Sequence, residues 1–167
     1  MIDDKAFDLS ASAFFDDVRG SLDIRELAAR TVVSLNSRFS HYTWVGIYWL
    51  RGGSLELGPW SGPEATEHVS IPLGKGICGS AAASGRIENV PDVGRDGRYL
   101  SCFLDTKSEI VVPLSRAGRI IGEIDIDGNE PAAFSSRDER FLSSVARLFD
   151  TGKEISPDVQ ANAERAF

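Results

Sequence analysis

The segments Ile110-Val-Val-Pro-Leu-Ser115 and Arg119-Ile-Ile-Gly-Glu-Ile-Asp-Ile-Asp127 lie on either side of the turn Arg116-Ala-Gly118. Two runs rich in branched residues, joined by a short turn that contains glycine, predict a β-hairpin. A second hairpin is predicted where the aromatic-rich segment 44–50 is followed, after a Gly-Gly turn, by residues 55–58. The centre of the chain is therefore expected to form an antiparallel sheet.

Helices are predicted around these hairpins. In residues 22–38 the apolar side chains recur at steps of three and four, as on one face of an amphipathic helix. Ser135 and Ser136 are suitable N-caps for a last helix that begins near Arg137. The other expected elements are helices at 11–18 and 79–84 and strands at 68–71 and 87–90. This order predicts an α+β domain in which helices pack on an antiparallel sheet.

Composition narrows the class of protein. The chain has 167 residues, 42% of them hydrophobic and 26% charged, as expected for one globular domain. Its net charge of −7 argues against a nucleic-acid partner, since Lys and Arg form no basic patch. It contains no apolar run long enough to span a bilayer and no signal peptide, so we expect no membrane partner and a cytoplasmic location.

Acidic residues alternate with isoleucines in the second strand of the 110–127 hairpin. Because neighbouring side chains of a strand point to opposite faces, Glu123, Asp125 and Asp127 are expected to share one face. A solvated outer face is the simpler interpretation. The alternative is a pocket that binds an ammonium group or protonates an oxygen, since like charges repel unless they share a cation or proton. Glu109, at the start of a very apolar strand, is open to the same two interpretations.

Two cysteines, Cys78 and Cys102, stand 24 residues apart. In a reducing compartment they are not expected to form a structural disulfide. Cys78 follows Gly74-Lys-Gly-Ile and opens a short helix, where the helix dipole and Lys75 would favour the thiolate. Simple packing is the other interpretation of a small buried cysteine. The residues alone leave open which cysteine attacks a substrate, and the spacing of Cys and His predicts no metal site.

Three aromatic residues, Trp44, Tyr48 and Trp60, lie in or beside the first hairpin. Such residues usually form core. They could also form an apolar wall for a thioether or another flat ligand.

Several strings resemble the GAF domains of free methionine-(R)-sulfoxide reductases. The most specific are Gly74-Lys-Gly-Ile-Cys-Gly79 and Ile124-Asp-Ile-Asp127. The resemblance covers about residues 23–150 and includes 44–48, 57–60, 71–80, 90–93, 108–114 and 120–127. It implies a GAF domain over 21–150, with a six-stranded antiparallel sheet and helices packed on one face. A helical segment, 1–20, precedes the domain and a polar tail, 151–167, follows it.

The resemblance also implies an activity. The expected reaction is reduction of free L-methionine (R)-S-oxide, with Cys102 as the nucleophile, Cys78 as its resolving partner and Glu109 as the acid. The substrate would be bound by Glu109, Asp125, Asp127 and the three aromatic residues. The family's first cysteine corresponds to His68 here.

No cofactor is expected, thioredoxin is the implied reductant, and a homodimer formed through residues 11–38 and 137–150 is the implied assembly. A non-catalytic GAF sensor that binds a small molecule is the alternative function.

Overall fold

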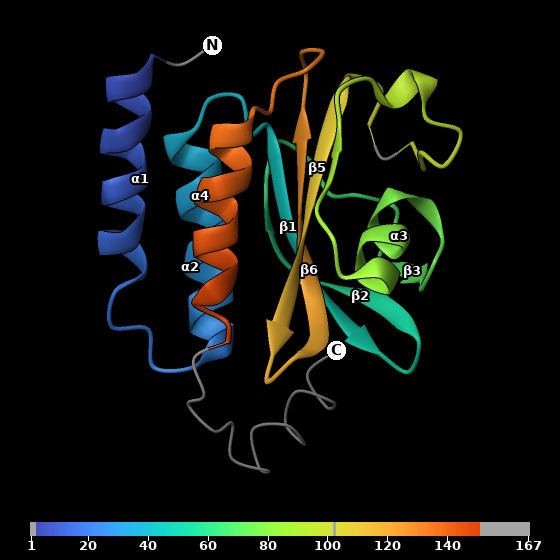
Figure 1. Cartoon of the computed structure of the whole chain (residues 1–167), viewed down its shortest axis with the longest axis horizontal. Coiled ribbons are helices and arrows are strands. Elements are labelled where there is room, and N and C mark those ends of the chain that lie inside the picture. Colours follow the sequence, from blue (N-terminus) through green and yellow to red (C-terminus); the bar gives the residue numbers. More distant parts are fainter. Residues whose placement is uncertain (1–2, 102, 151–167) are drawn as a thin grey trace.

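A computed structural model of the chain describes residues 3–101 and 103–150. Its centre is a six-stranded antiparallel sheet with the strand order β3-β2-β1-β6-β5-β4 (Figure 1). The strands are β1 (Trp44–Arg51), β2 (Ser54–Ser61), β3 (Ser70–Pro72), β4 (Glu88–Val90), β5 (Ser108–Arg116) and β6 (Arg119–Gly128). The helices are α1 (Asp4–Val18), α2 (Ile24–Arg38), α3 (Gly76–Ser84) and α4 (Ser136–Arg147), with a 3₁₀ turn at Val93–Arg95.

The two faces of the sheet are covered differently. Helices α1, α2 and α4 lie on one side and α3 lies on the other, as Figure 1 shows. The predicted α+β fold and six-stranded antiparallel sheet are confirmed, while α3 adds cover on the second face. No helix in the described part of the chain is both long and apolar enough to cross a membrane.

Alternation along the central strands assigns side chains to these two faces. On β6, Ile124 and Ile126 belong to the core beneath α1, α2 and α4. On β1, Trp44 and Tyr48 belong to a second core with Ile77 of α3. The residues between the isoleucines of β6 therefore point toward α3, and these are the acidic ones.

The β5–β6 hairpin turns as its sequence predicts. Ala117 and Gly118 both have positive φ angles, 49° and 74°. Positive φ at both central residues is the geometry that suits the right-handed twist of a two-residue hairpin. A register shift between Leu114 and Ser115 follows this turn, and beyond it Glu109 of β5 stands opposite Asp127 of β6.

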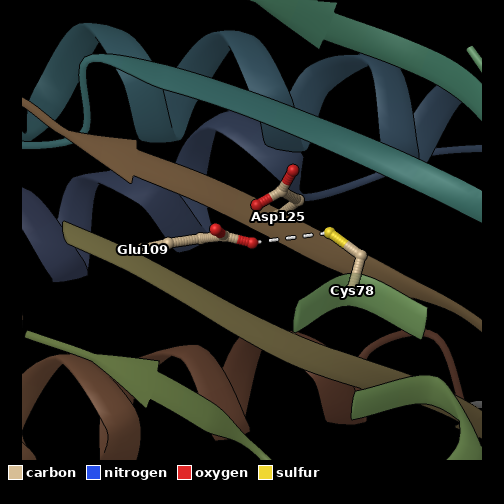
Figure 2. A group of neighbouring side chains, drawn as sticks. All are labelled: Cys78, Glu109 and Asp125. Atoms are coloured by element: carbon tan, nitrogen blue, oxygen red, sulfur yellow. Dashed lines mark hydrogen bonds between the residues drawn. The ribbon is translucent and has the colours of Figure 1, made fainter. Parts of the chain in front are cut away.

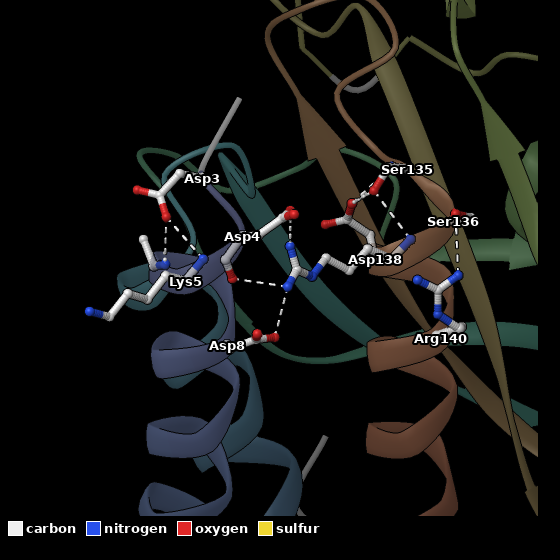
Figure 3. Close-up of polar contacts among 10 residues, drawn as sticks. Asp3, Asp4, Lys5, Asp8, Ser135, Ser136, Asp138 and Arg140 are labelled. Carbon is white, nitrogen blue, oxygen red and sulfur yellow. Dashed lines mark hydrogen bonds and ion pairs between the residues drawn. The ribbon is translucent and has the colours of Figure 1, made fainter.

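Helix α1 begins seven residues earlier than the predicted start at residue 11. Asp3 caps it, because its carboxylate accepts hydrogen bonds from the backbone N–H groups of Lys5 and Ala6 (Figure 3). Arg137 of α4 forms ion pairs with Asp4 and Asp8 of α1 (Figure 3). These polar contacts at the helix ends join the first helix of the chain to the last.

Asp138 connects α4 to the segment that leads into β1. Its carboxylate accepts hydrogen bonds from the Ser135 backbone N–H and from the Tyr42 hydroxyl, both at 2.8 Å, and lies 2.8 Å from His41 Nε2. Burial would raise the pKa of Asp138, but the hydrogen bonds from His41, Ser135 and Tyr42 outweigh it and hold this pKa at about 2. Asp138 is therefore ionised throughout the neutral range.

We expect Asp138→Ala to lower the free energy of unfolding by about 2–4 kcal/mol, because it removes a helix cap and leaves the buried Tyr42 hydroxyl without its acceptor. Urea denaturation at pH 7 measures this loss. Asp16→Ala is the matched control: its ion pair with Arg19 is exposed, so a change below about 0.5 kcal/mol is expected. Equal losses in the two variants would show that Asp138 does not have this anchoring role.

Candidate active site

The turn before α3 places Cys78 against the sheet. Gly74 and Gly76 adopt positive φ angles of 81° and 67°, which allow the chain to turn sharply into the helix. A Cβ atom at Gly79 would stand 2.6 Å from the Pro72 carbonyl oxygen, so only glycine lets the helix pack this closely on β3. The result is a Cys78 side chain only 6% exposed, facing β5 and β6.

Four carboxyl groups line the sheet beneath α3. Glu109 comes from β5, and Glu123, Asp125 and Asp127 come from β6. Because Ile124 and Ile126 between them face the opposite core, the expectation that the β6 acids share a face is confirmed, and all four acids are only 0–5% exposed. The simpler interpretation, a solvated outer face, is wrong because α3 and the loops beside it cover these residues.

The thiol and two of these carboxyls form a tight group. One ligand atom each from Cys78, Glu109 and Asp125 lies within 4.8 Å of the other two. The Cys78 thiol donates a hydrogen bond to Glu109 Oε1 over 3.6 Å, drawn as the dashed line in Figure 2. The figure also shows the Asp125 carboxyl pointing toward the same space. A helix residue and residues from two strands therefore converge on one point.

Burial and mutual repulsion shift the pKa of every acid in this group. Burial raises the pKa of Glu123 to about 8, and burial together with the charge of Glu123 raises that of Asp125 to about 8. Burial and the charge of Asp125 also raise the pKa values of Glu109 and Asp127 well above their usual range. Protonated carboxyl groups are therefore available at neutral pH as proton donors.

The prediction that helix α3 favours a Cys78 thiolate is wrong. Burial raises the pKa of Cys78 well above its ordinary value, and the charges of Asp125, Glu123 and Glu109 raise it further. The helix dipole falls off within the first turn and amounts to a partial charge, so three neighbouring carboxyls outweigh it. In this structure Cys78 is a protonated thiol that donates to a carboxyl.

A cavity of about 210 Å³ opens beside the acidic group. Asp127 lies in its lining, and Trp44, its register partner on β1, forms part of the wall. The indole covers Gly46 so closely that a Cβ there would stand 2.3 Å from the ring. The remaining lining comes from Thr43, Pro63, Glu64, Phe103, Leu104, Asp105, Thr106 and Asn129. The cavity thus combines an aromatic wall with a buried carboxyl.

The other two predicted aromatic residues are placed differently. Trp60 is 38% exposed and stacks on Trp44 with the ring centroids 6.3 Å apart. Tyr48 is fully buried, stands opposite Glu123 in the sheet and donates its hydroxyl to the His68 carbonyl oxygen over 2.8 Å. Neither residue is part of the cavity lining, so Trp44 alone of the three borders the cavity.

The structure brings most of the expected site residues to one side of the sheet. Cys102 and the tail 151–167 lie outside the described residues. His68 Nε2 lies 3.2 Å from the carbonyl oxygen of Ser101, the residue before Cys102 in the sequence. Sequence reasoning missed Phe103 and Thr106 as cavity residues, since a loop offers no periodicity that could reveal them.

Comparison with known proteins agrees with this architecture. The sequence model of the GAF domain family matches residues 23–150. The free methionine-R-sulfoxide reductase of Escherichia coli is 37% identical over 121 residues, which are 72% of each chain. Aligned segments cover 61–76% of the length of the five curated relatives that were compared.

Solved structures of free methionine-R-sulfoxide reductases are similar to this chain as well. A type II free methionine-R-sulfoxide reductase of Thermoplasma acidophilum is 44% identical, with a TM-score of 0.72 over 76% of this chain and 92% of that one. The reductase of Neisseria meningitidis in complex with its substrate is 30% identical, with a TM-score of 0.81 over 99% and 96% of the two chains.

The fold and the matched region define a GAF domain. Within that class, the chain belongs to the free methionine-R-sulfoxide reductases, a family of enzymes.

The raised pKa of Glu123 makes stability depend on pH. A buried acid that stays protonated stabilises the folded state at pH 5, and this contribution is lost as pH rises toward its folded pKa of about 8. Between pH 5 and pH 8 the unfolding free energy of the parent chain should therefore fall by roughly 3 kcal/mol more than that of Glu123→Gln. Urea denaturation at both pH values measures the difference.

Glu67→Gln, a change at an exposed residue, is the control. Its unfolding free energy should depend on pH as that of the parent chain does. A Glu123→Gln profile that also follows the parent would contradict the burial of a protonated Glu123.

Proposed function

We propose that this chain reduces free L-methionine (R)-S-oxide to methionine by thiol chemistry. The observation that carries the proposal is the buried group of Cys78, Glu109 and Asp125 beside a cavity lined by Trp44 and Asp127. It unites a thiol, carboxyls with raised pKa values and an aromatic wall in a member of this reductase family.

The proposed reaction has three steps. Sulfur of Cys102 attacks the sulfoxide sulfur while Glu109 protonates the oxygen, so methionine leaves and Cys102 becomes a sulfenic acid. The Cys78 thiol then condenses with the sulfenic acid, releasing water and forming a Cys78–Cys102 disulfide. A dithiol reductant restores both thiols by exchange. The sulfoxide gains the two electrons that the two thiols lose.

The acids also give a reason for selecting a free amino acid. A free substrate carries an ammonium group, which the buried Asp125 and Asp127 would hold. A peptide-bound methionine sulfoxide lacks that charge and would leave these acids without a cation. Trp44 would contact the apolar end of the substrate, and Tyr48 and Trp60 would support that wall through packing.

The remaining parts of the proposal concern partners and location. Thioredoxin is the proposed reductant, since a disulfide formed in each cycle must be reopened by a dithiol. A homodimer that uses α1, α2 and α4 is the proposed assembly, with the cytoplasm as its location. Exposed Leu9, Leu22 and Val33 on or beside the first two helices fit a surface of this kind.

We expect NADPH consumption when the chain is combined with thioredoxin, thioredoxin reductase and free methionine-R-sulfoxide. The S epimer and a peptide-bound R-sulfoxide should give less than a hundredth of that rate, because neither satisfies both the sulfur geometry and the buried acids. Cys102→Ser should abolish methionine formation. Cys78→Ser should still form about one methionine per chain but lose turnover with thioredoxin.

Unreacted thiols and no turnover with any of the substrates would contradict the enzymatic proposal and favour a GAF module that only binds a small ligand. Full activity of Cys102→Ser would contradict its assignment as the nucleophile.

Asp127→Asn tests the ammonium contact. It should raise KM for the free sulfoxide by about 10- to 100-fold, since a charge-assisted hydrogen bond contributes about 1.5–3 kcal/mol. Steady-state kinetics with the coupled assay measures KM and kcat separately. Glu67→Gln, an exposed change, is the matched control and should leave both constants unchanged; an unchanged KM in Asp127→Asn would exclude Asp127 from the ammonium site.

A further inference from the structure

The group formed by Cys78, Glu109 and Asp125 has the composition of a metal-ligand set. We propose that the dithiol form of the chain binds one thiophilic divalent cation, of which Zn²⁺ is the physiological example, between the Cys78 sulfur and the carboxylates of Glu109 and Asp125. The sequence offered no closely spaced Cys and His motif for such a site. The ligands come together only through the packing of α3 on β5 and β6.

The distances permit this coordination. The three ligand atoms lie within 4.8 Å of one another, and Zn²⁺ binds sulfur at about 2.3 Å and carboxylate oxygen at about 2.0–2.2 Å. One ion can therefore be shared by the three residues once their side chains rotate toward it. One thiolate and two carboxylates leave a fourth tetrahedral position, which a water can fill.

Oxygen atoms without partners provide an independent reason to expect a ligand here. Both carboxyl oxygens of Glu123 and the Oδ1 atom of Asp125 are buried and accept no hydrogen bond from the described residues. Glu123 is 0% and Asp125 2% exposed. Buried polar atoms in native proteins are nearly always paired, because leaving one unpaired costs about 1–3 kcal/mol. A cation bound by the Asp125 carboxylate supplies such a partner and lies beside the Glu123 side of β6.

The ligand types select the class of cation. Mg²⁺ and Ca²⁺ prefer six or more oxygen ligands, and Mg²⁺ keeps much of its water. A thiolate with carboxylates in a small dry site instead favours Zn²⁺ and its spectroscopic substitute Co²⁺. On binding, the Cys78 thiol and any protonated carboxyl of Glu109 and Asp125 release their protons to solvent, and the sulfur and carboxylate oxygens bond to the metal; no electron is transferred.

Occupation of this site would affect catalysis, a consequence that rests on the proposed function. The bound ion holds the sulfur that must close the disulfide, and it holds Glu109, the proposed proton donor. The chain would then be inhibited by Zn²⁺ only in its reduced form. Formation of the Cys78–Cys102 disulfide removes the sulfur ligand, so oxidation should release the ion.

Binding is tested on the full reduced chain with Co²⁺ as the probe. We expect one Co²⁺ per chain and a near-ultraviolet thiolate-to-cobalt charge-transfer band that Zn²⁺ displaces. Cys78→Ser should abolish the band, and Asp125→Asn should weaken binding at least tenfold with the thiol intact. Cys102→Ser is the matched control and should retain the band.

Three results would overturn the proposal: no band with excess Co²⁺, a band lost in Cys102→Ser but kept in Cys78→Ser, or Mg²⁺ displacing Co²⁺ as well as Zn²⁺ does. Near-ultraviolet circular dichroism confirms that each variant is folded. Because the band is read without substrate, its absence and a failure of the reductase proposal are separate outcomes.

Discussion

The exclusion of water from four carboxyl groups and a thiol is the constraint on which this structure depends. Ionised carboxylates packed together in a dry interior would be unstable, so the group must hold protons or a cation. The sheet makes this arrangement possible because hydrogen bonding between β5 and β6 fixes Glu109 opposite Asp127. Helix α3 then closes the group with the Cys78 thiol. Chemistry and folding are thus coupled in the same residues.

The two faces of the sheet contribute differently to stability. One face of the sheet carries a large apolar core shared with α1, α2 and α4. This core contains isoleucines from β5 and β6 whose neighbours on the same strands are acidic. The free energy gained on that face, at about 25 cal/mol per Å² of apolar surface, offsets the cost of burying polar groups on the other. A strand with alternating isoleucine and aspartate serves both purposes at once.

Sequence periodicity predicted most of the architecture but not the environment of the site. The hairpins and the shared face of Glu123, Asp125 and Asp127 follow from alternation, a local property of strands. Whether that face meets water depends on where α3 packs, which is a long-range property. The protonated state of Cys78 was missed for the same reason, since the opposing charges come from β5 and β6. The early start of α1 follows from the Asp3 cap; the buried Phe7 stands seven residues before Phe14, a helical spacing that the predicted range 11–18 left out.

The structure shows what His68 contacts, at the position where the sequence resemblance implies a further cysteine. His68 at that position contacts the Ser101 carbonyl oxygen and supplies the carbonyl that accepts from Tyr48, so its role here is in packing and hydrogen bonding. In the proposed reaction two thiols would suffice, since one sulfoxide takes two electrons. Cys78, held protonated beside carboxyls, would react only after a sulfenic acid has formed nearby.

The most direct test of this account is a single turnover of the reduced chain with one equivalent of free methionine-R-sulfoxide and no external reductant. Thiol titration and peptide mass spectrometry after quenching measure the products. The account predicts one methionine formed, two thiols lost and one intramolecular Cys78–Cys102 disulfide per chain. Methionine formed with both thiols still free, or a disulfide only between chains, would contradict it.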